Sequence, residues 1–336
     1  MNKKAIAISI VFIIILMGAG MWFLRSPVNP QKYSGPVEKL RFCTSMQSVS
    51  APIFVAQAKN YFIKHGLDID FTYHTAGILC LQDLIDRKMD VATVAGTGFV
   101  FKNLEHPGLK ILASLATSET AIRLVARKSI ISKPADLKGK TIGTTIGTDA
   151  HFFLNSLLIF AGLNTSDVKI LNFKPDELPS ALSDGKVDAI VTWEPNITNA
   201  QKALGDNAIT LPAQIGNKSY WLLVSRQDVI NEKSEIINRL LTALLEADTY
   251  IEFSPIELKD ILSRYTNPTF AYLEKAFSEY TFSTLLSQDM IVALENATRW
   301  AITNKLTDQT KIPNYLNNIY FDALEAVKPE AVNIIH

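Results

Sequence analysis

The sequence predicts an α/β protein with two lobes, each a mixed, mainly parallel sheet flanked by helices, with a ligand cleft between the lobes. Strand patterns alternate with helical patterns in both halves of the 336-residue chain. Apolar residues make up 48% of the chain and charged residues 20%, which is typical of a globular protein. A near repeat occupies a helix-to-strand turn in each half: Asp86-Arg87-Lys88-Met89-Asp90-Val91-Ala92 and Asp184-Gly185-Lys186-Val187-Asp188-Ala189-Ile190.

The first 25 residues differ from the rest in composition. Lys3 and Lys4 precede an almost unbroken apolar run from Ala5 to Leu24. About twenty helical residues span about 30 Å, the thickness of a bilayer core, whereas a cleavable signal has an apolar core of about 7–15 residues. We expect residues 1–25 to be an uncleaved membrane anchor, and leave a cleaved export signal open. The lysines place the remainder on the periplasmic side of the inner membrane, or free in the periplasm after cleavage.

The proline- and glycine-containing residues 26–37 are expected to link this segment to the folded body. We assign residues 38–126 and 219–336 to the first lobe and residues 127–218 to the second. Strands near 121–126 and 219–225 would then act as hinges.

In the first lobe, Pro52 suits the first turn of a helix that ends near Lys64, before a capping Gly66. A second helix is expected over 78–87, where Leu81, Leu84 and Ile85 have helical spacing. We expect strands at 40–43, 67–73 and 91–95 around these helices.

The second lobe repeats this order. Strands are expected at 141–143, 168–171 and 189–192, with helices over 149–160 and 177–183. After residue 225 the pattern is helical, near 228–251, 255–265, 270–279 and 288–304.

The charge balance excludes one class of partner. Lys plus Arg and Asp plus Glu both number 33, so the formal net charge is zero. Binding to a phosphate backbone requires an excess of basic residues. We therefore expect no nucleic acid partner.

Cys43 lies in an apolar strand pattern and Cys80 on a probable helix face. We expect two buried free thiols, although a disulfide is open because such bonds persist outside the cytoplasm. The two cysteines lack the clustered spacing of a metal site, so we predict no metal and no cofactor.

Ligands of open parallel sheets bind beyond the carboxyl ends of the strands, so the loops there are the candidate site. The predicted ligand-binding residues are Ser45, Gln47, Ser48, Thr97, Gly98, Ser118, Thr145, Thr148, His151, Trp193 and Glu194.

Each loop has a simpler structural alternative. The backbone N–H groups and hydroxyls of residues 144–151 could hold an anion at a helix N-terminus, although an inward-pointing Asp149 would oppose it, or Thr148 or Asp149 could only cap the helix. Trp193 and Glu194 could cover a ligand and bind its amine, or be a packed tryptophan and a solvated glutamate before a helix. Glu119 and Arg123 could be ligand contacts or ion-pair members. His74 and His151 lack a defined third partner, so we predict no catalysis.

The chain also carries a series of motifs in a characteristic order. They are Ala56-Gln57-Ala58-Lys59-Asn60-Tyr61-Phe62, His65-Gly66-Leu67-Asp68-Ile69, Lys88-Met89-Asp90-Val91-Ala92, Leu137-Lys138-Gly139-Lys140-Thr141-Ile142-Gly143 and Val187-Asp188-Ala189-Ile190-Val191-Thr192-Trp193-Glu194-Pro195. With them the sequence resembles the nitrate/sulfonate/taurine-binding family of periplasmic proteins, which is similar to thiamine-pyrimidine-precursor binders. The resemblance covers about residues 38–225 and implies a type II periplasmic binding protein-like fold.

The resemblance implies a monomeric solute-binding protein that delivers a small molecule to an ABC permease. A sulfonate- or taurine-like solute is the first expectation. A thiamine-pyrimidine precursor or another small heteroaromatic is the alternative, with Phe99, Phe152 and Trp193 as an aromatic slot. A ligand sensor, or an enzyme on the same fold, is the second alternative, although the pyrimidine synthases carry a cysteine cluster that this chain lacks.

Overall fold

The structure is a computed structural model that describes residues 33–266 and 278–336. The predicted anchor over 1–25 lies outside these residues, as do most of the predicted linker and of the helix near 270–279. Within the described ranges, no helix combines the length and apolarity needed to cross a membrane. The description below concerns the unit formed by residues 35–336.

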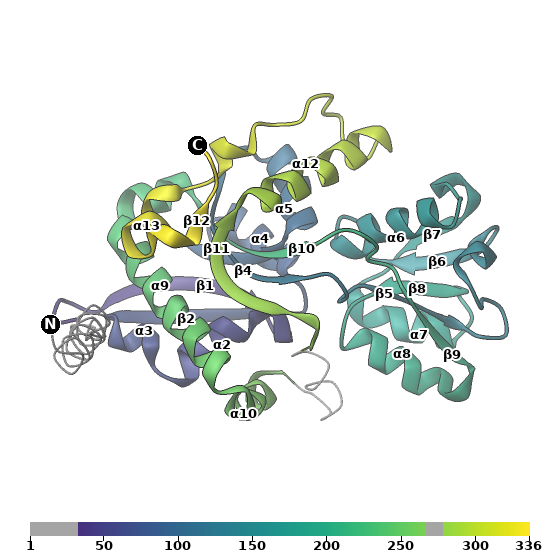
Figure 1. Cartoon of the computed structure of the whole chain (residues 1–336), viewed down its shortest axis with the longest axis horizontal. Helices are drawn as coiled ribbons and strands as arrows, with labels where there is room; N and C mark the ends of the chain where they lie inside the picture. The colour runs from purple at the N-terminus through teal and green to yellow at the C-terminus, as the bar shows by residue number, and fades with distance from the viewer. Residues whose placement is uncertain (1–32, 267–277) are drawn as a thin grey trace, which may run out of the picture. The chain divides into compact units, whose positions relative to one another are not determined.

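The larger sheet has seven strands in the order β12-β11-β4-β10-β3-β1-β2 (Figure 1). β1 pairs in parallel with β2 and β3, whereas β10 is antiparallel to β3 and β4. β11 is antiparallel to β4 and parallel to β12. The strands are β1 (Glu38–Ser45), β2 (Leu67–His74), β3 (Val91–Ala95), β4 (Leu109–Ser118), β10 (Ser219–Arg226), β11 (Thr281–Ser287) and β12 (Val332–Asn333).

The smaller sheet has five strands in the order β7-β6-β8-β5-β9. β6 is parallel to β7 and β8, and β5 is antiparallel to β8 and β9. The strands are β5 (Arg123–Arg127), β6 (Thr141–Thr144), β7 (Lys169–Asn172), β8 (Ala189–Thr192) and β9 (Ala208–Pro212). The expected lobe boundary after residue 126 falls inside β5. The whole of β5 pairs with β8 and β9, so the strand belongs to the smaller sheet.

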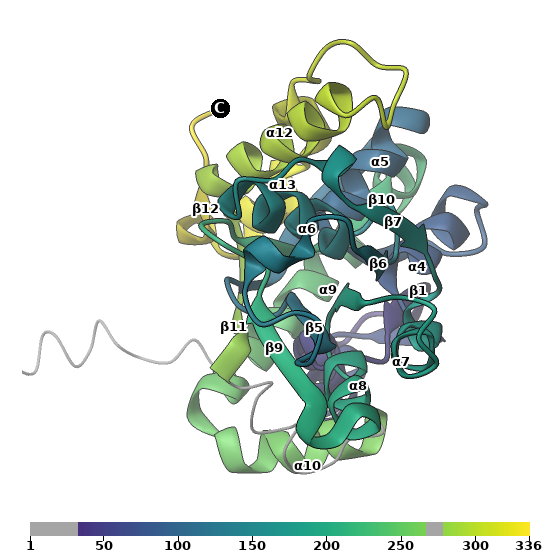
Figure 2. The ribbon, with the colours of Figure 1, turned by 90° about the vertical axis from the view of Figure 1, so that its right-hand side faces the viewer.

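Helices cover both faces of the smaller sheet, α6 on one and α7 with α8 on the other (Figure 2). Strand alternation accounts for this: Leu124 packs with α6, while its neighbour Val125 packs with α7 and α8. The helices of this lobe are α6 (Asp149–Phe160), α7 (Leu178–Ser183) and α8 (Asn196–Leu204).

The remaining helices belong to the lobe of the larger sheet. They are α2 (Ala51–Ala58), α3 (Tyr61–Lys64), α4 (Gly77–Ile85), α5 (Gly96–Glu105), α9 (Gln227–Phe253), α10 (Pro255–Tyr265), α12 (Gln288–Thr303) and α13 (Phe321–Val327). The single helix expected over 52–64 is two helices, because Asn60 between them adopts a left-handed conformation with φ 57°.

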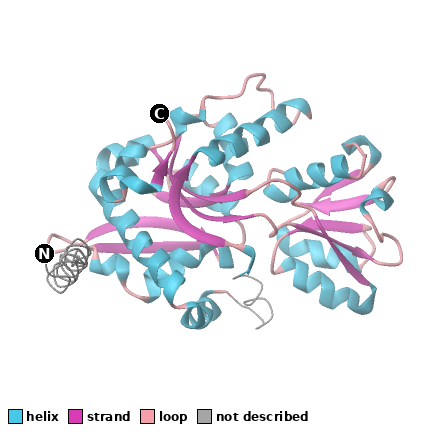
Figure 3. Ribbon diagram, viewed as in Figure 1, coloured by secondary structure: helices cyan, strands magenta, loops and turns pink. Residues whose placement is uncertain are grey.

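The chain crosses between the two sheets twice, through residues 119–122 and 213–218 (Figure 3). The side-chain amide of Gln214 ties the crossings together: its oxygen accepts from the Ile122 backbone N–H at 3.3 Å, and its nitrogen donates to the Ser118 carbonyl. The Ile122 carbonyl also accepts from the backbone N–H of Ala213 at 3.3 Å. The two crossings are therefore a hydrogen-bonded pair.

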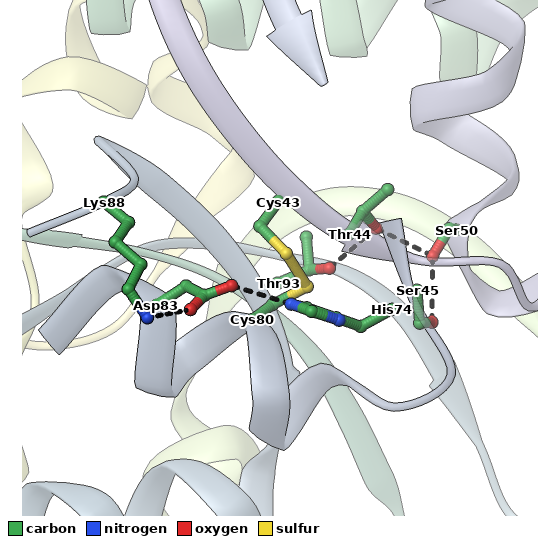
Figure 4. Close-up of a disulfide and its surroundings, with 9 residues drawn as sticks. All are labelled: Cys43, Thr44, Ser45, Ser50, His74, Cys80, Asp83, Lys88 and Thr93. Carbon is green, nitrogen blue, oxygen red and sulfur yellow. Dashed lines mark hydrogen bonds and ion pairs between the residues drawn. A yellow bond between two sulfur atoms is a disulfide. The ribbon is translucent and has the colours of Figure 1, made fainter. Parts of the chain in front are cut away.

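The expectation of two free thiols is wrong. Cys43 on β1 and Cys80 on α4 form a disulfide with Cα atoms 5.2 Å apart, and both residues are fully buried (Figure 4). α4 packs on β1 and β3, which brings the two side chains together. The spacing of the two cysteines in the sequence does not predict that they are in contact.

Candidate functional site

A cleft enclosing about 630 Å³, including part of its open mouth, lies where the two sheets meet. Its walls come from both lobes and are largely apolar. The lining residues are Gln47, Val49, Ala76, Gly77, Ile78, Val94, Ala95, Gly98, Ala116, Thr117, Ser118, Ala121, Ile122, Thr148, Asp149, Trp193, Ser219, Tyr220, Trp221 and Tyr280.

Strand direction explains this position. β1, β3 and β4 all end at the cleft, as expected for the carboxyl edge of a sheet. β10 runs the opposite way, so it begins there: Ser219 pairs with Ser118, and Trp221 pairs with Ala95 and Ala116. The cleft is therefore lined by the last residues of β3 and β4, by the first residues of β10 and by the segment that follows β1.

Two indole groups are the most informative features of the wall. Trp193 follows β8 in the smaller sheet and Trp221 lies in β10 of the larger one, and both are at least nine-tenths buried. The Nε1 of each is buried and has no protein acceptor. A buried donor without an acceptor costs about 1–3 kcal/mol, so a molecule that supplies two acceptor atoms would relieve both.

α4 approaches the Trp221 indole so closely that its first residue must lack a side chain. A Cβ placed on Gly77 would lie 2.6 Å from Trp221 Cη2 and 2.7 Å from the Thr93 carbonyl oxygen. Gly77 thus lets α4 seat Trp221 against the sheet. The position of that indole is fixed by packing.

The start of α6 supplies the second lobe's polar contribution. Thr148 occupies the N-cap position, but its hydroxyl donates to the Thr145 carbonyl at 2.6 Å and makes no side-chain cap hydrogen bond. The interpretation of Thr148 as a side-chain cap is therefore wrong. Both Thr148 and Asp149 line the cleft.

Asp149 connects the lobes. Its Oδ1 accepts a hydrogen bond from the Thr97 backbone N–H, in the first turn of α5, at 3.1 Å. Burial raises the pKa of Asp149 above its ordinary value, partly offset by the hydrogen bonds from Thr97. Because Thr97 already holds this carboxylate, Asp149 is poorly placed to act as the main partner of a ligand cation.

The cleft has no cationic side chain among the residues that the structure describes. The nearby cationic side chains form ion pairs with carboxylates outside the cleft lining. Arg123 pairs with Glu279, and Lys218 Nζ lies 3.1 Å from Asp289 Oδ2 and 4.0 Å from Glu119 Oε1. Arg123 and Glu119 are therefore ion-pair members, the simpler of the two alternatives for each.

Five predicted residues line the cleft: Gln47, Gly98, Ser118, Thr148 and Trp193. Two of them have clear local partners. The Gln47 side-chain amide donates to the Thr75 carbonyl at 2.7 Å, and Ser118 Oγ accepts from the Thr120 and Ala121 backbone N–H groups at 3.1 and 3.0 Å. These bonds hold the loops that form the wall.

The other predicted residues lie outside this cleft. Ser45 Oγ is 3.4 Å from Ser50 Oγ, and Ser48 is buried in the turn after β1. Thr145 Oγ1 donates to the Phe173 carbonyl at 3.0 Å, and Thr97 lines a smaller cavity that shares Asp149 with the cleft.

His151 and Glu194 have structural contacts. His151 packs edge-on against Trp300 with centroids 4.8 Å apart, and burial lowers its pKa to about 4. Glu194 is buried, and its Oε2 accepts from the Thr198 backbone N–H in α8 at 3.0 Å. The alternative of a solvated glutamate is therefore wrong, and the carboxylate stabilises the first turn of α8.

The proposed aromatic slot is composed differently from the prediction. Phe99 is fully buried near Tyr315, and Phe152 packs on Trp300. Trp193 is joined instead by Tyr220, Trp221 and Tyr280, none of which was predicted as a site residue. The missed signal was the pair Tyr220-Trp221 at the start of a strand, which reaches the cleft only because β10 is antiparallel.

Comparison of the sequence with known proteins matches this chain to one family and to named relatives. The family described as NMT1/THI5 like matches residues 47–257. The taurine-binding periplasmic protein of Escherichia coli (strain K12) is 24% identical over 218 residues, 63% of this chain and 67% of that protein. A protein of Haemophilus influenzae, provisionally named a thiamine biosynthesis protein, is 28% identical over 211 residues, 62% and 66% of the two chains.

A solved structure shows the same architecture. The alkanesulfonate-binding protein of Xanthomonas axonopodis pv. citri, bound to MOPS, aligns with a TM-score of 0.73 at 20% identity, covering 85% of this chain and 99% of that one. The predicted periplasmic binding protein fold is thereby confirmed. With more than half of its residues matched by the family, this chain is a member of the NMT1/THI5-like family.

Proposed function

We propose that the chain is the extracytoplasmic solute-binding component of an ABC import system. The fold and the family relationship support a binding protein, and the cleft is lined from both lobes. A ligand that contacts both lobes favours the closed form, which a permease could then recognise. The N-terminal apolar segment would keep the protein near its permease and raise the effective concentration.

For the ligand, we propose a small, flat, uncharged heteroaromatic molecule with at least two acceptor atoms. The observation that carries this choice is the pair of unpartnered indole N–H groups in an apolar cleft. Ring nitrogens or carbonyl oxygens would accept from Trp193 and Trp221, while the aromatic side chains would cover the ring faces.

The described lining argues against a small inorganic anion such as nitrate. An anion taken from water into an apolar cleft requires charge-assisted partners, and neither lysine nor arginine lines the described part of this one. Asp149 adds a carboxyl group whose ionised form would repel an anion. On these two observations we propose the heteroaromatic class before the sulfonate class.

A taurine-like zwitterion is the second candidate, because Asp149 is the one carboxylate in the described lining. The indole N–H groups would then bind the sulfonate, and the Asp149 carboxylate would bind the ammonium. Its existing hydrogen bond from Thr97 makes this arrangement weaker.

Catalysis has no support from the positions of the two histidines. His74 Nε2 lies 2.7 Å from Asp83 Oδ2 beside the disulfide, and His151 is packed on Trp300. Neither lines the cleft. We therefore propose a binding protein and not an enzyme.

Calorimetry on the full chain in detergent tests the ligand class. The ligands are a substituted aminopyrimidine, taurine, ethanesulfonate and nitrate. We expect saturable one-to-one binding of the aminopyrimidine and none of nitrate. Tight nitrate binding would refute the ligand class, and failure of all small solutes would refute the binding function.

Two variants separate donor loss from loss of packing. Trp193→Phe and Trp221→Phe keep an aromatic ring but remove the N–H, and each should weaken binding by about 10-fold. Trp300→Phe is the matched control, because Trp300 also has an unpartnered buried Nε1 but does not line the cleft. Equal weakening in all three variants would contradict the role of the two indole donors.

A further inference from the structure

A second cluster of chemistry-bearing side chains surrounds the disulfide, and none of its four members lines the ligand cleft (Figure 4). One donor atom from each of Cys43, His74 and Asp83 lies within 4.8 Å of the other two. The sulfur of Cys80 is bonded to that of Cys43. β1, β2 and α4 thus bring one sulfur, one imidazole and one carboxylate together, with the second sulfur bonded to the first.

We propose that reduction of this disulfide creates a binding site for a thiophilic divalent metal ion such as Zn²⁺. The site has four donor side chains: Cys43, Cys80, His74 and Asp83. Two thiolates, one imidazole and one carboxylate are all established zinc ligands, and four is the coordination number of a closed zinc site. This proposal is independent of the solute that the cleft binds.

The burial of the donors gives the site an inner and an outer side. Both cysteines are fully buried, whereas the side chains of His74 and Asp83 are 32% and 17% exposed. A metal ion would therefore enter past the imidazole and the carboxylate. The buried sulfurs would bind it from beneath, where little water competes.

Two neighbouring side chains contact the Asp83 carboxylate. Its Oδ2 lies 2.7 Å from His74 Nε2, and its Oδ1 lies 3.0 Å from Lys88 Nζ. The Lys88 ammonium would offset part of the single negative charge left by Zn²⁺ with two thiolates and a carboxylate.

The redox step balances with a dithiol as the reductant. The dithiol supplies two electrons and two protons, the S–S bond breaks, Cys43 and Cys80 become thiols, and the dithiol closes to its own disulfide. Metal binding then releases both thiol protons to water as two metal–sulfur bonds form. His74 binds through a neutral ring nitrogen and Asp83 as its carboxylate.

Cobalt(II) tests the site directly, because a thiolate-bound cobalt ion has a charge-transfer absorption in the near ultraviolet. The full chain in detergent is titrated with Co²⁺ in its disulfide form and after phosphine reduction, with both thiols counted by alkylation and mass spectrometry. We expect one Co²⁺ per reduced chain, displaced by Zn²⁺, and no thiolate band in the disulfide form. Equal binding by both forms, or no band from the reduced chain, would overturn the proposal.

Variants identify the non-sulfur ligands. His74→Gln and Asp83→Asn should each weaken Co²⁺ binding by about 10-fold or more, since even the loss of an outer partner of a metal ligand costs about 10–100-fold. His106→Gln is the control, because His106 is exposed on the loop after α5. Unchanged affinity in both test variants would rule out these two ligands.

A thermal melt tests whether the reduced chain is folded and whether a metal ion stabilises it. Reduced protein should melt at a higher temperature with Zn²⁺ than with a chelator, whereas the disulfide form should show no such difference. If the reduced chain is unfolded and Zn²⁺ fails to refold it, the proposed site does not exist.

Discussion

The Asp149 carboxylate at the start of α6 accepts a hydrogen bond from the backbone N–H of Thr97 at the start of α5, across the junction of the two sheets. The helices belong to different lobes, so this bond reports how the lobes meet. Removing its acceptor with Asp149→Ala should lower the free energy of unfolding by about 1–3 kcal/mol, because the buried N–H loses its partner. Asp149→Asn keeps an acceptor oxygen and should cost less. Urea unfolding of both variants checks this order, which equal losses would contradict.

Gly77 should tolerate no larger residue. Gly77→Ala would place a Cβ 2.6 Å from Trp221 Cη2 and 2.8 Å from the Val94 Cα, so we expect a loss of about 1–3 kcal/mol in stability together with weaker ligand binding. Gly96→Ala is the matched control, since its added Cβ would meet nothing nearer than Leu294 Cδ2 at 3.6 Å. Thermal melts and calorimetry on both variants test the difference. A Gly77→Ala protein as stable as Gly96→Ala would refute the packing argument.

The disulfide should stabilise the fold substantially. Cys43 and Cys80 are 37 residues apart, and closing a loop of this length stabilises a protein by about 2–4 kcal/mol. The double variant Cys43→Ala/Cys80→Ala should lose that amount in a chelator-containing buffer, as should the reduced parent chain. Unfolding curves of the oxidised parent, the reduced parent and the variant provide the test. No difference between the two parent forms would show that the bond contributes nothing.

Asp248 should make stability depend on pH in a defined window. Burial raises its pKa to about 6, while its Oδ2 accepts from the Thr284 backbone N–H at 2.6 Å. A carboxyl group with a raised pKa in the folded state favours folding at low pH, and this contribution is lost as pH rises from about 4 to about 6. Relative to Asp248→Asn, the parent chain should therefore lose on the order of 3 kcal/mol across this window.

Urea unfolding at several pH values measures that difference. Taking the difference between parent and variant cancels the other titrating groups, including Asp90 and Asp289, whose pKa values are lowered to about 2. A difference that does not change between pH 4 and 6 would contradict the raised pKa.

The periodic parts of the fold could be predicted from the sequence, because apolar spacing is a local signal. The strands near 67–73 and 189–192 and the helices over 149–160 and 228–251 all appear in the structure. β4 escaped prediction because Leu109–Ser118 is apolar on both faces and has no clear alternation.

The site was less predictable, because it depends on strand direction and packing. Trp193 follows a parallel strand, where the carboxyl-edge rule finds it. Trp221 lies at the beginning of an antiparallel strand, where that rule does not apply. The Cys43–Cys80 bond likewise depends on how α4 packs on the sheet, which local pattern does not encode.

The paired crossings have a consequence for how this molecule is organised. Residues 123–212 leave the larger sheet and return to it at hydrogen-bonded neighbours, since Ile122 and Ala213 bond to each other directly. The whole smaller sheet is therefore a single insertion in the chain that forms the larger sheet, and it has a hydrophobic core of its own. Its length and content could change without rerouting any strand of the larger sheet, so the two walls of the cleft are free to diversify at different rates.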